Sequence, residues 1–164
     1  MKKILTEIKI TKKEGNMHYL NIELDGIDKN GEEKKFKLSE LKGKNLIVYF
    51  YPQDDTPVCT KEAQEFRDAI DKIQEFAQII GVSNNNINDH LDFQKKYELN
   101  FILLSDPNNK LKKAFEEYDI HLQNLHRATF IINKEGKIIK YWNKVDVDEH
   151  IEDILNFFKI KNDT

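Results

Sequence analysis

The sequence predicts an α/β protein in which a central mixed sheet lies between layers of helices. Short apolar runs rich in β-branched and aromatic residues alternate with longer stretches whose apolar residues recur every three or four positions. This alternation favours strands of one sheet with helices on both faces, a three-layer sandwich. A compact hairpin pattern near the C-terminus adds antiparallel strands, so the sheet is expected to be mixed. At 164 residues we expect one domain, residues 1–164.

The first 25 residues are expected to add an N-terminal β-hairpin within that domain. Residues 3–11 and 17–25 alternate between polar and apolar side chains, as half-buried strands do. The segment 13–16 between them contains Gly15 and Asn16, which are typical turn residues.

The strand predicted over residues 45–51 is the longest apolar run, and Pro52 marks its end because proline has no N–H to donate to a sheet. After a polar loop, Thr56 fits the N-cap of a helix and Pro57 its first position. The Asn84–Asn86 segment is interpreted as a turn and nothing more. The other predicted strands are 32–38, 77–83, 101–106, 127–133 and 137–142, and the other predicted helices are 87–99, 108–118 and 148–159.

Composition excludes several classes of protein. The net charge is −3 and charges of both signs are mixed along the chain, so we expect neither a nucleic-acid partner nor a membrane partner. The alternating first ten residues lack the apolar core of a signal peptide, and no transmembrane run follows. A single cysteine rules out an intrachain disulfide and a multi-cysteine zinc site. It also favours a reducing compartment, so we expect a cytoplasmic protein.

That single cysteine, Cys59, falls at the third position of the helix predicted to start at Pro57. The backbone N–H groups of a first turn are unpaired, and the helix dipole places positive charge there, which favours the thiolate form of a cysteine. A lone cysteine on the apolar face of a helix is more often an inert core residue. Its position directly behind Thr56 and Pro57 argues instead for a nucleophile.

The pattern Pro52-x-x-x-Thr56-x-x-Cys59 resembles the peroxidatic motif of the peroxiredoxins. The similarity is greatest to their bacterioferritin comigratory protein, or peroxiredoxin Q, subfamily, and it covers most of the chain after Leu41. The segments that carry it are Phe50-Tyr51-Pro52, Asp54-Asp55-Thr56-Pro57, Cys59-Thr60-Lys61-Glu62-Ala63, Phe66-Arg67-Asp68, Gly81-Val82-Ser83 and Leu103-Leu104-Ser105-Asp106-Pro107.

The resemblance implies a thioredoxin-like fold and a thiol-dependent peroxidase that reduces hydrogen peroxide and alkyl hydroperoxides without a metal or organic cofactor. It implies that Cys59 is the peroxidatic nucleophile, assisted by Thr56 and Pro52, and that Arg127 meets the cysteine. An exposed charge at a strand end is the simpler interpretation of Arg127. His126 also suggests the base of a Cys-His hydrolase, but no oxyanion-hole pattern accompanies it. The remaining alternative is a binding or chaperone protein of the same fold with a vestigial thiol.

The chain departs from its relatives in how Cys59 is reduced again after it reacts with peroxide. Many members of the subfamily carry a second cysteine five residues after the first, and here that position is Gln64. We therefore expect a one-cysteine cycle, in which an external thiol reduces the sulfenic acid of Cys59. The expected reductants are a thioredoxin, a glutaredoxin or a small thiol, and the expected assembly is a monomer or a weak homodimer.

Overall fold

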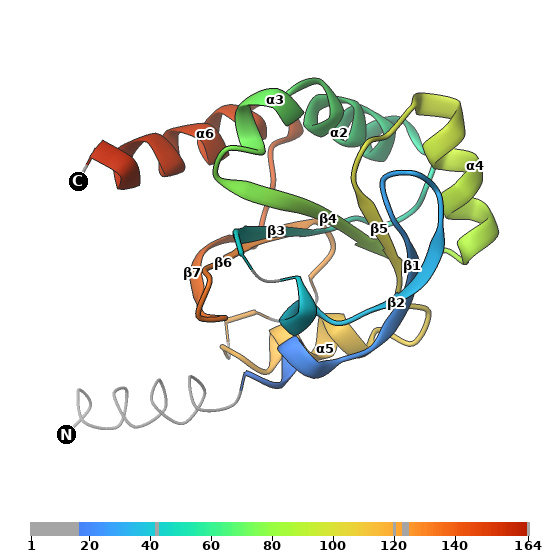
Figure 1. Ribbon diagram of the computed structural model, residues 1–164, viewed down its shortest axis with the longest axis horizontal. Helices are drawn as coiled ribbons and strands as arrows, with labels where there is room; N and C mark the ends of the chain where they lie inside the picture. The colour runs from blue at the N-terminus through green and yellow to red at the C-terminus, as the bar shows by residue number, and fades with distance from the viewer. Residues whose placement is uncertain (1–16, 42, 120, 123–124, 164) are drawn as a thin grey trace.

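The computed structural model describes residues 17–41, 43–119, 121, 122 and 125–163. In this part of the chain seven strands form one sheet in the order β2-β1-β5-β4-β3-β6-β7 (Figure 1). The strands are β1 (Leu24–Ile27), β2 (Glu33–Phe36), β3 (Asn45–Phe50), β4 (Ala77–Ser83), β5 (Ile102–Ser105), β6 (Ala128–Ile132) and β7 (Ile138–Trp142). The helices are α2 (Pro57–Asp68), α3 (Ile70–Ile73), α4 (Ile87–Tyr97), α5 (Lys110–Glu116) and α6 (Val147–Asp163), with 3-10 turns η1 (His18–Asn21) and η2 (Leu38–Glu40).

The sheet is mixed, as predicted. Strand β3 runs parallel to β4 and antiparallel to β6, and β4 runs parallel to β5. The two outer pairs, β1 with β2 and β6 with β7, are antiparallel. Central strands with neighbours on both sides bury both of their faces, which explains why residues 45–51 are almost continuously apolar.

Helices cover both faces of the sheet and give the three layers that the sequence predicts. Helices α2, α3 and α6 lie on one face and α5 on the other (Figure 1). The side chains of β3 alternate accordingly, since Tyr49 packs with Phe66 of α2 while Phe50 packs with Phe115 of α5. Two apolar clusters result, one on each side of the sheet.

The predicted N-terminal hairpin lies in part outside the described residues, since its first strand and turn fall in 1–16. Its second strand, 17–25, is wrong over His18–Asn21, which form η1. The reason is Tyr19, whose ring is fully buried and stacks on Phe115 at 4.7 Å between centroids. The Tyr19 hydroxyl also donates to the Gly136 carbonyl at 2.7 Å. Strand structure begins only at Leu24, and β1 pairs with β2 and β5.

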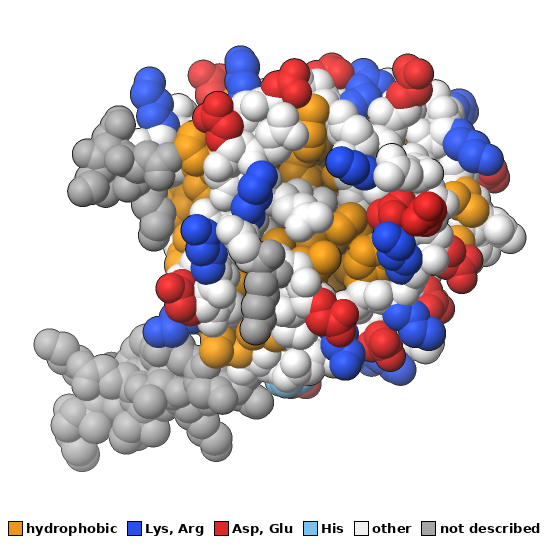
Figure 2. Space-filling view, viewed as in Figure 1, with side chains coloured by type: hydrophobic (Ala, Val, Ile, Leu, Met, Phe, Trp, Pro, Cys, Tyr) orange, Lys and Arg blue, Asp and Glu red, His pale blue; other side chains and the backbone are white. Residues whose placement is uncertain are grey.

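The surface carries charges of both signs. On the face drawn in Figure 2, the Lys and Arg side chains of the described residues are interspersed with Asp and Glu, without a large area of one sign. Within the described residues, none of the helices combines the length and the apolarity that crossing a membrane requires.

Candidate active site

The loop between β3 and α2 leads directly to the predicted nucleophile, Cys59. Helix α2 starts at Pro57 with Thr56 at the N-cap, as predicted, and Cys59 lies in its first turn. Asp55, in the loop, has a φ of 59°, the left-handed conformation in which the chain turns sharply. The Cys59 side chain faces the sheet and is only 2% exposed. The fold therefore holds the thiol at the positive end of a helix and shielded from bulk water.

Arg127 reaches the thiol from the neighbouring strand. Strand β6 pairs antiparallel with β3 so that Ala128 lies opposite Phe50, which places Arg127 beside the loop that follows β3. Its Nη2 atom donates a hydrogen bond to Cys59 Sγ at 3.3 Å. A guanidinium is always charged, so this contact places a positive charge directly beside the sulfur. The structure brings Arg127 and Cys59 together, 68 positions apart in the chain.

Glu62 is a site residue that the sequence analysis missed. It lies one turn after Cys59 on the same face of α2, and its Oε1 accepts a hydrogen bond from Arg127 Nη1 at 2.6 Å. The Glu62 side chain is 2% exposed, and its Oε2 has no hydrogen-bond partner among the described residues. Burial raises the pKa of Glu62 to about 7, although Arg127 opposes this effect. A glutamate on the apolar face of the predicted helix is the signal that could have revealed it.

Glu62 and Cys59 together fix the orientation of Arg127. One terminal nitrogen of the guanidinium bonds to the carboxylate and the other to the sulfur. Since the guanidinium is planar and its donors are rigidly spaced, two partners on one helix face define its plane. Among the described residues the remaining donors make no hydrogen bond, so they can meet a negative charge that develops near the sulfur.

Thr56 occupies the N-cap without capping the helix through its side chain. Its hydroxyl instead donates to the Gln53 carbonyl at 2.9 Å, across the loop. The hydroxyl proton is therefore engaged, and the lone pairs of Oγ1 remain able to accept a hydrogen bond from a substrate. Pro52, half-buried at the start of the same loop, has no N–H to be satisfied.

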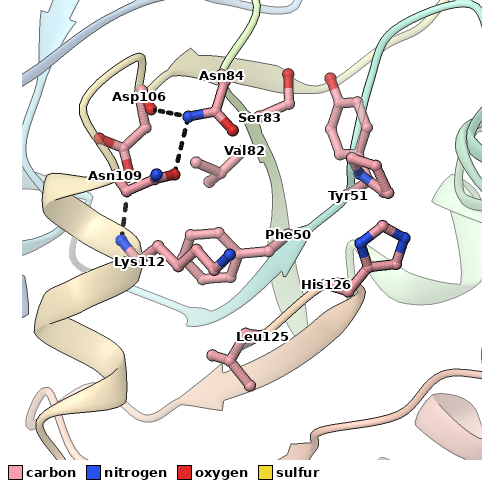
Figure 3. Close-up of a pocket in the computed structure, with 11 residues that line it drawn as sticks. Phe50, Tyr51, Val82, Ser83, Asn84, Asp106, Asn109, Lys112, Leu125 and His126 are labelled. Carbon is pink, nitrogen blue, oxygen red and sulfur yellow. Dashed lines mark hydrogen bonds between the residues drawn. The ribbon is translucent and has the colours of Figure 1, made fainter. Parts of the chain in front are cut away.

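A cavity of about 200 Å³ lies beside this loop. Figure 3 shows Lys112 and His126 on opposite sides of it, with Phe50 and Tyr51 from the end of β3. His126 is exposed, and among the described residues it makes no hydrogen bond to Cys59. The thiol is paired with an arginine, so the geometry gives no support to a Cys-His hydrolase.

Comparisons with known proteins agree with this geometry. Residues 18–141 match the AhpC/TSA family. The chain is 42% identical over 130 residues to peroxiredoxin Bcp of Bacillus subtilis, covering 75% of this chain and 83% of that protein. It is 37% identical over 134 residues to the chloroplastic peroxiredoxin Q of Gentiana triflora, covering 80% of this chain and 62% of that protein.

Solved structures give the same result. A cysteine-to-serine variant of peroxiredoxin Q from Xanthomonas campestris superposes with a TM-score of 0.76 at 28% identity, covering 88% of this chain and 94% of that one. A second variant of that protein replaces a different cysteine. Another structure, under the name bacterioferritin comigratory protein, is described in terms of alkyl peroxide reduction; its TM-score is 0.76 at 27% identity, covering 88% of this chain and 94% of that one. The Xanthomonas protein thus has at least two cysteines where this chain has one.

Proposed function

The chain belongs to the AhpC/TSA family and is a thiol-dependent peroxidase of the Bcp/peroxiredoxin Q type with the thioredoxin-like fold, and we propose that Cys59 is its peroxidatic nucleophile. The observation that carries this proposal is the hydrogen bond from Arg127 to Cys59 Sγ in the first turn of α2. The alternative, a binding or chaperone protein with a vestigial thiol, is not favoured, because an inert core cysteine needs no arginine bonded to its sulfur.

In the proposed reaction, the Cys59 thiolate attacks the terminal oxygen of a hydroperoxide. A sulfur–oxygen bond forms as the oxygen–oxygen bond breaks, and the sulfur is oxidised by two electrons to sulfenic acid. The leaving oxygen takes up a proton from water and departs as water or an alcohol. Hydrogen peroxide and alkyl hydroperoxides are the proposed substrates.

The residues around Cys59 have distinct roles in this step. The free donors of Arg127, together with the first-turn N–H groups of α2, stabilise the negative charge that grows on the peroxide oxygens. Thr56, whose own proton is held by Gln53, accepts a hydrogen bond from the hydroperoxide and orients it. Pro52 has no backbone N–H, so the loop has no unpaired donor at this position. The residue thereby helps to limit water near the thiolate.

Recycling needs an external thiol, because the chain contains one cysteine. A thiol attacks the sulfenic acid and releases water, and a second thiol reduces the resulting mixed disulfide. We propose a thioredoxin, a glutaredoxin or a small thiol as the reductant. We also propose that the protein is a monomer or a weak homodimer.

The test is peroxide consumption by the purified protein, with intact mass measured at each stage. We expect an increase of one oxygen after one equivalent of peroxide, then a thiol adduct when a small thiol is added, and loss of the adduct with excess thiol. Cys59→Ser should show none of these changes. Undiminished turnover in that variant would disprove the proposed nucleophile. A rapidly formed disulfide-linked dimer on a non-reducing gel would instead exclude the external thiol as the first resolving step.

A further inference from the structure

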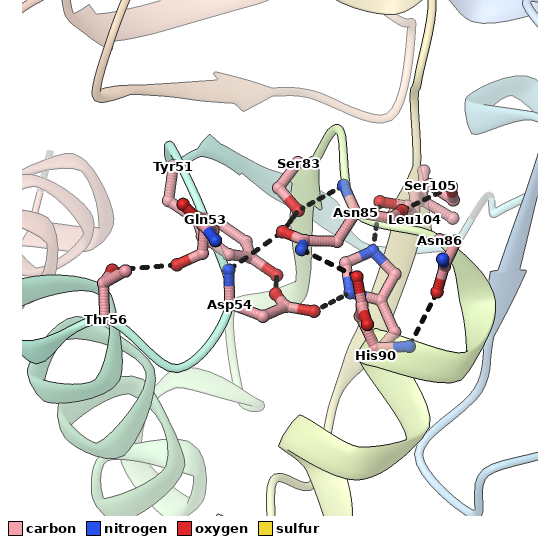
Figure 4. A network of polar contacts seen from close by, with 11 residues as sticks. Tyr51, Gln53, Asp54, Thr56, Ser83, Asn85, Asn86, His90, Leu104 and Ser105 are labelled. Atoms are coloured by element: carbon pink, nitrogen blue, oxygen red, sulfur yellow. Dashed lines mark hydrogen bonds and ion pairs between the residues drawn. The ribbon is translucent and has the colours of Figure 1, made fainter.

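A polar network lies around the active-site loop, and its buried centre, on the far side of the loop from α2, consists of two residues that the proposed reaction does not use, His90 and Asp54 (Figure 4). At its centre, His90 of α4 is fully buried and its Nδ1 lies 2.6 Å from Asp54 Oδ2. The Asp54 side chain is 4% exposed. The other ring nitrogen, Nε2, lies 2.9 Å from the Leu104 carbonyl oxygen. Each nitrogen of this imidazole thus faces an oxygen.

The partners of His90 define its hydrogen bonds. The Leu104 carbonyl can only accept, so Nε2 donates to it. Asp54 Oδ1 already accepts a hydrogen bond from the Tyr51 hydroxyl at 2.6 Å, and burial raises the pKa of Tyr51 well above its usual range, so Tyr51 remains a donor. The second Asp54 oxygen, Oδ2, meets His90 Nδ1 in a short hydrogen bond. Both nitrogens of the ring and both oxygens of the carboxyl group are therefore paired.

The contact between Asp54 and His90 holds the active-site loop in place. Asp54 lies two residues after Pro52 and two before Thr56, and its backbone N–H donates to Asn85 Oδ1 at 2.8 Å. Asn85 is itself held, since its carbonyl accepts from Ser105 Oγ at 2.6 Å and its side chain bonds Ser83. The loop is thereby tied to the ends of β4 and β5 and to α4, all of which are rigid elements.

Net stability is a poor explanation for such a pair. Removing two polar groups from water has a free-energy cost that their hydrogen bond must first offset, and apolar residues of similar volume often stabilise a core as well or better. What a buried, fully hydrogen-bonded pair provides is one defined geometry. A displacement of about 1 Å in a catalytic group can reduce a rate by roughly a hundredfold, so a defined loop position has a direct kinetic value.

We propose that His90 is a positioning residue for the peroxidase reaction: through Asp54 it holds the loop so that Thr56 meets the hydroperoxide at the correct angle. The proposal rests on the function proposed for Cys59. It predicts that loss of the pair impairs reaction with peroxide but leaves the intrinsic reactivity of the thiolate intact. Arg127 and the first turn of α2 control that reactivity, and neither contacts His90 through any hydrogen bond between described residues.

The hydrogen bond between His90 and Asp54 is tested first, in the wild-type protein, by NMR of ¹⁵N-labelled histidine. We expect a strongly downfield proton signal from this short hydrogen bond, assigned by its loss in His90→Gln. Absence of that signal would show that the bond does not form in solution and would overturn the proposal. This readout does not depend on peroxidase activity, so it stands even if the function of Cys59 were different.

The positioning role is tested by two rates of Cys59 modification in Asp54→Asn and His90→Gln. Both variants keep hydrogen-bonding groups and similar volume, and each is checked for folding by circular dichroism. We expect oxidation by hydrogen peroxide to slow by about tenfold or more, while alkylation by iodoacetamide, which does not need Thr56, changes by less than about twofold. A merely structural role would leave the ratio of the two rates unchanged, and that result would refute the proposal.

The matched control is an exposed contact of the same loop. Lys96 Nζ bonds Asp55 Oδ2 at 2.9 Å, and both side chains are well exposed, so this pair contributes little. Lys96→Gln should leave both rates within about twofold of wild type. An equal loss of peroxide rate in Lys96→Gln would show that any contact to the loop matters and would remove the special role of His90. If Cys59→Ser alone retained full peroxidase activity, the proposed function would fail independently of these results.

Discussion

At the scale of single residues, the geometry of Arg127 is the feature that separates Cys59 from an ordinary buried cysteine. Its two terminal nitrogens bond Cys59 and Glu62 at the same time. Charge alone does not give this arrangement, because a lysine presents one point charge and cannot span two partners with a rigid fork. The Arg127 side chain therefore contributes both a positive charge and N–H groups that point in fixed directions.

Arg127→Met should reduce the rate of Cys59 oxidation by hydrogen peroxide by roughly 10²-fold, the scale expected when one charge-stabilising donor is lost. Arg127→Lys is the matched control: it keeps the charge but loses the fork, and we expect an intermediate rate. Stopped-flow fluorescence of the reduced proteins measures both. A rate for Arg127→Met within a few-fold of wild type would contradict the assigned role.

Two substitutions of Thr56 separate the effect of its hydroxyl group from the effect of its side-chain volume. Thr56→Val keeps the volume but loses the hydrogen bond to the Gln53 carbonyl and the acceptor for the peroxide, so we expect roughly a 10²-fold slower oxidation. Thr56→Ser keeps the hydroxyl and should stay within about tenfold of wild type. Equal rates in the valine and serine variants would show that only the volume of the side chain matters.

The sequence points to Cys59 and Thr56 because the chemistry proposed for them depends on local position at a helix start, and the resemblance supplies Arg127. Glu62 was missed because its role depends on Arg127, a partner from a distant strand that periodicity does not reveal. The interpretation of Asn84–Asn86 as a turn and nothing more is wrong. Asn84 bonds the Asp106 carbonyl, Asn85 holds Asp54, and Asn86 accepts from the Asp89 N–H as the N-cap of α4.

At the scale of elements, the predicted strands and helices agree closely with the structure from Glu33 onwards, and the strand over Ala77–Ser83 is reproduced residue for residue. This agreement has a physical reason: burial on one face of a helix or both faces of a strand leaves a strong periodic pattern. The pattern fails at His18–Asn21, where a single buried aromatic ring, Tyr19, decides the local structure. Alternation of polar and apolar residues there does not indicate a strand.

Helix α5 illustrates a helix start that depends on a side chain outside the helix, three residues before its N-cap. Its N-cap, Asn109, makes no side-chain capping bond, and Asp106 supplies the acceptors instead. The Asp106 carboxylate accepts from the N–H groups of Lys110, Leu111 and Lys112 at 2.8, 3.0 and 3.2 Å. Since this helix has only seven residues, its stability depends strongly on that cap.

Asp106→Asn should lower the free energy of unfolding by about 1–2 kcal/mol, because an amide offers one acceptor oxygen where the carboxylate offers two. Urea unfolding followed by circular dichroism measures the change. Asp146→Asn is the control, since Asp146 is exposed and accepts a single backbone bond from Asp148, and its effect should stay below about 0.5 kcal/mol. Equal losses in the two variants would contradict the capping role.

At the scale of the whole molecule, two buried titratable groups, Glu62 of α2 and His150 of α6, act on stability in opposite directions. His150 of α6 is 2% exposed, packs edge-on against Phe66 and Trp142, and exchanges a hydrogen bond with Thr129 Oγ1 at 2.7 Å. Burial lowers the pKa of His150 to about 4 from its usual 6.5. Burial raises the pKa of Glu62 to about 7 from its usual 4.5.

The sign of each contribution follows from which state binds the extra proton. Between pH 4 and 6.5 the unfolded chain protonates His150 while the folded protein does not, so this residue makes stability fall as pH falls. Between pH 4.5 and 7 the folded protein keeps the proton of Glu62 while the unfolded chain releases it, so this residue makes stability fall as pH rises. Over the shared window the two effects oppose each other and flatten the profile of the wild-type protein.

Glu62→Gln and His150→Gln separate the two effects, because glutamine does not titrate. The free energy of unfolding is measured in urea at several pH values from 4.5 to 7, with Cys59 kept reduced. Relative to Glu62→Gln, the wild-type protein should lose stability as pH rises; relative to His150→Gln, it should gain stability as pH rises. Taking the difference in free energy of unfolding between the wild-type protein and a variant removes the contribution of every group that titrates equally in both. If the stability curve of either variant runs parallel to that of the wild-type protein, the pKa of that buried group is the same in the folded and the unfolded state. That result would contradict the opposing contributions of the two residues.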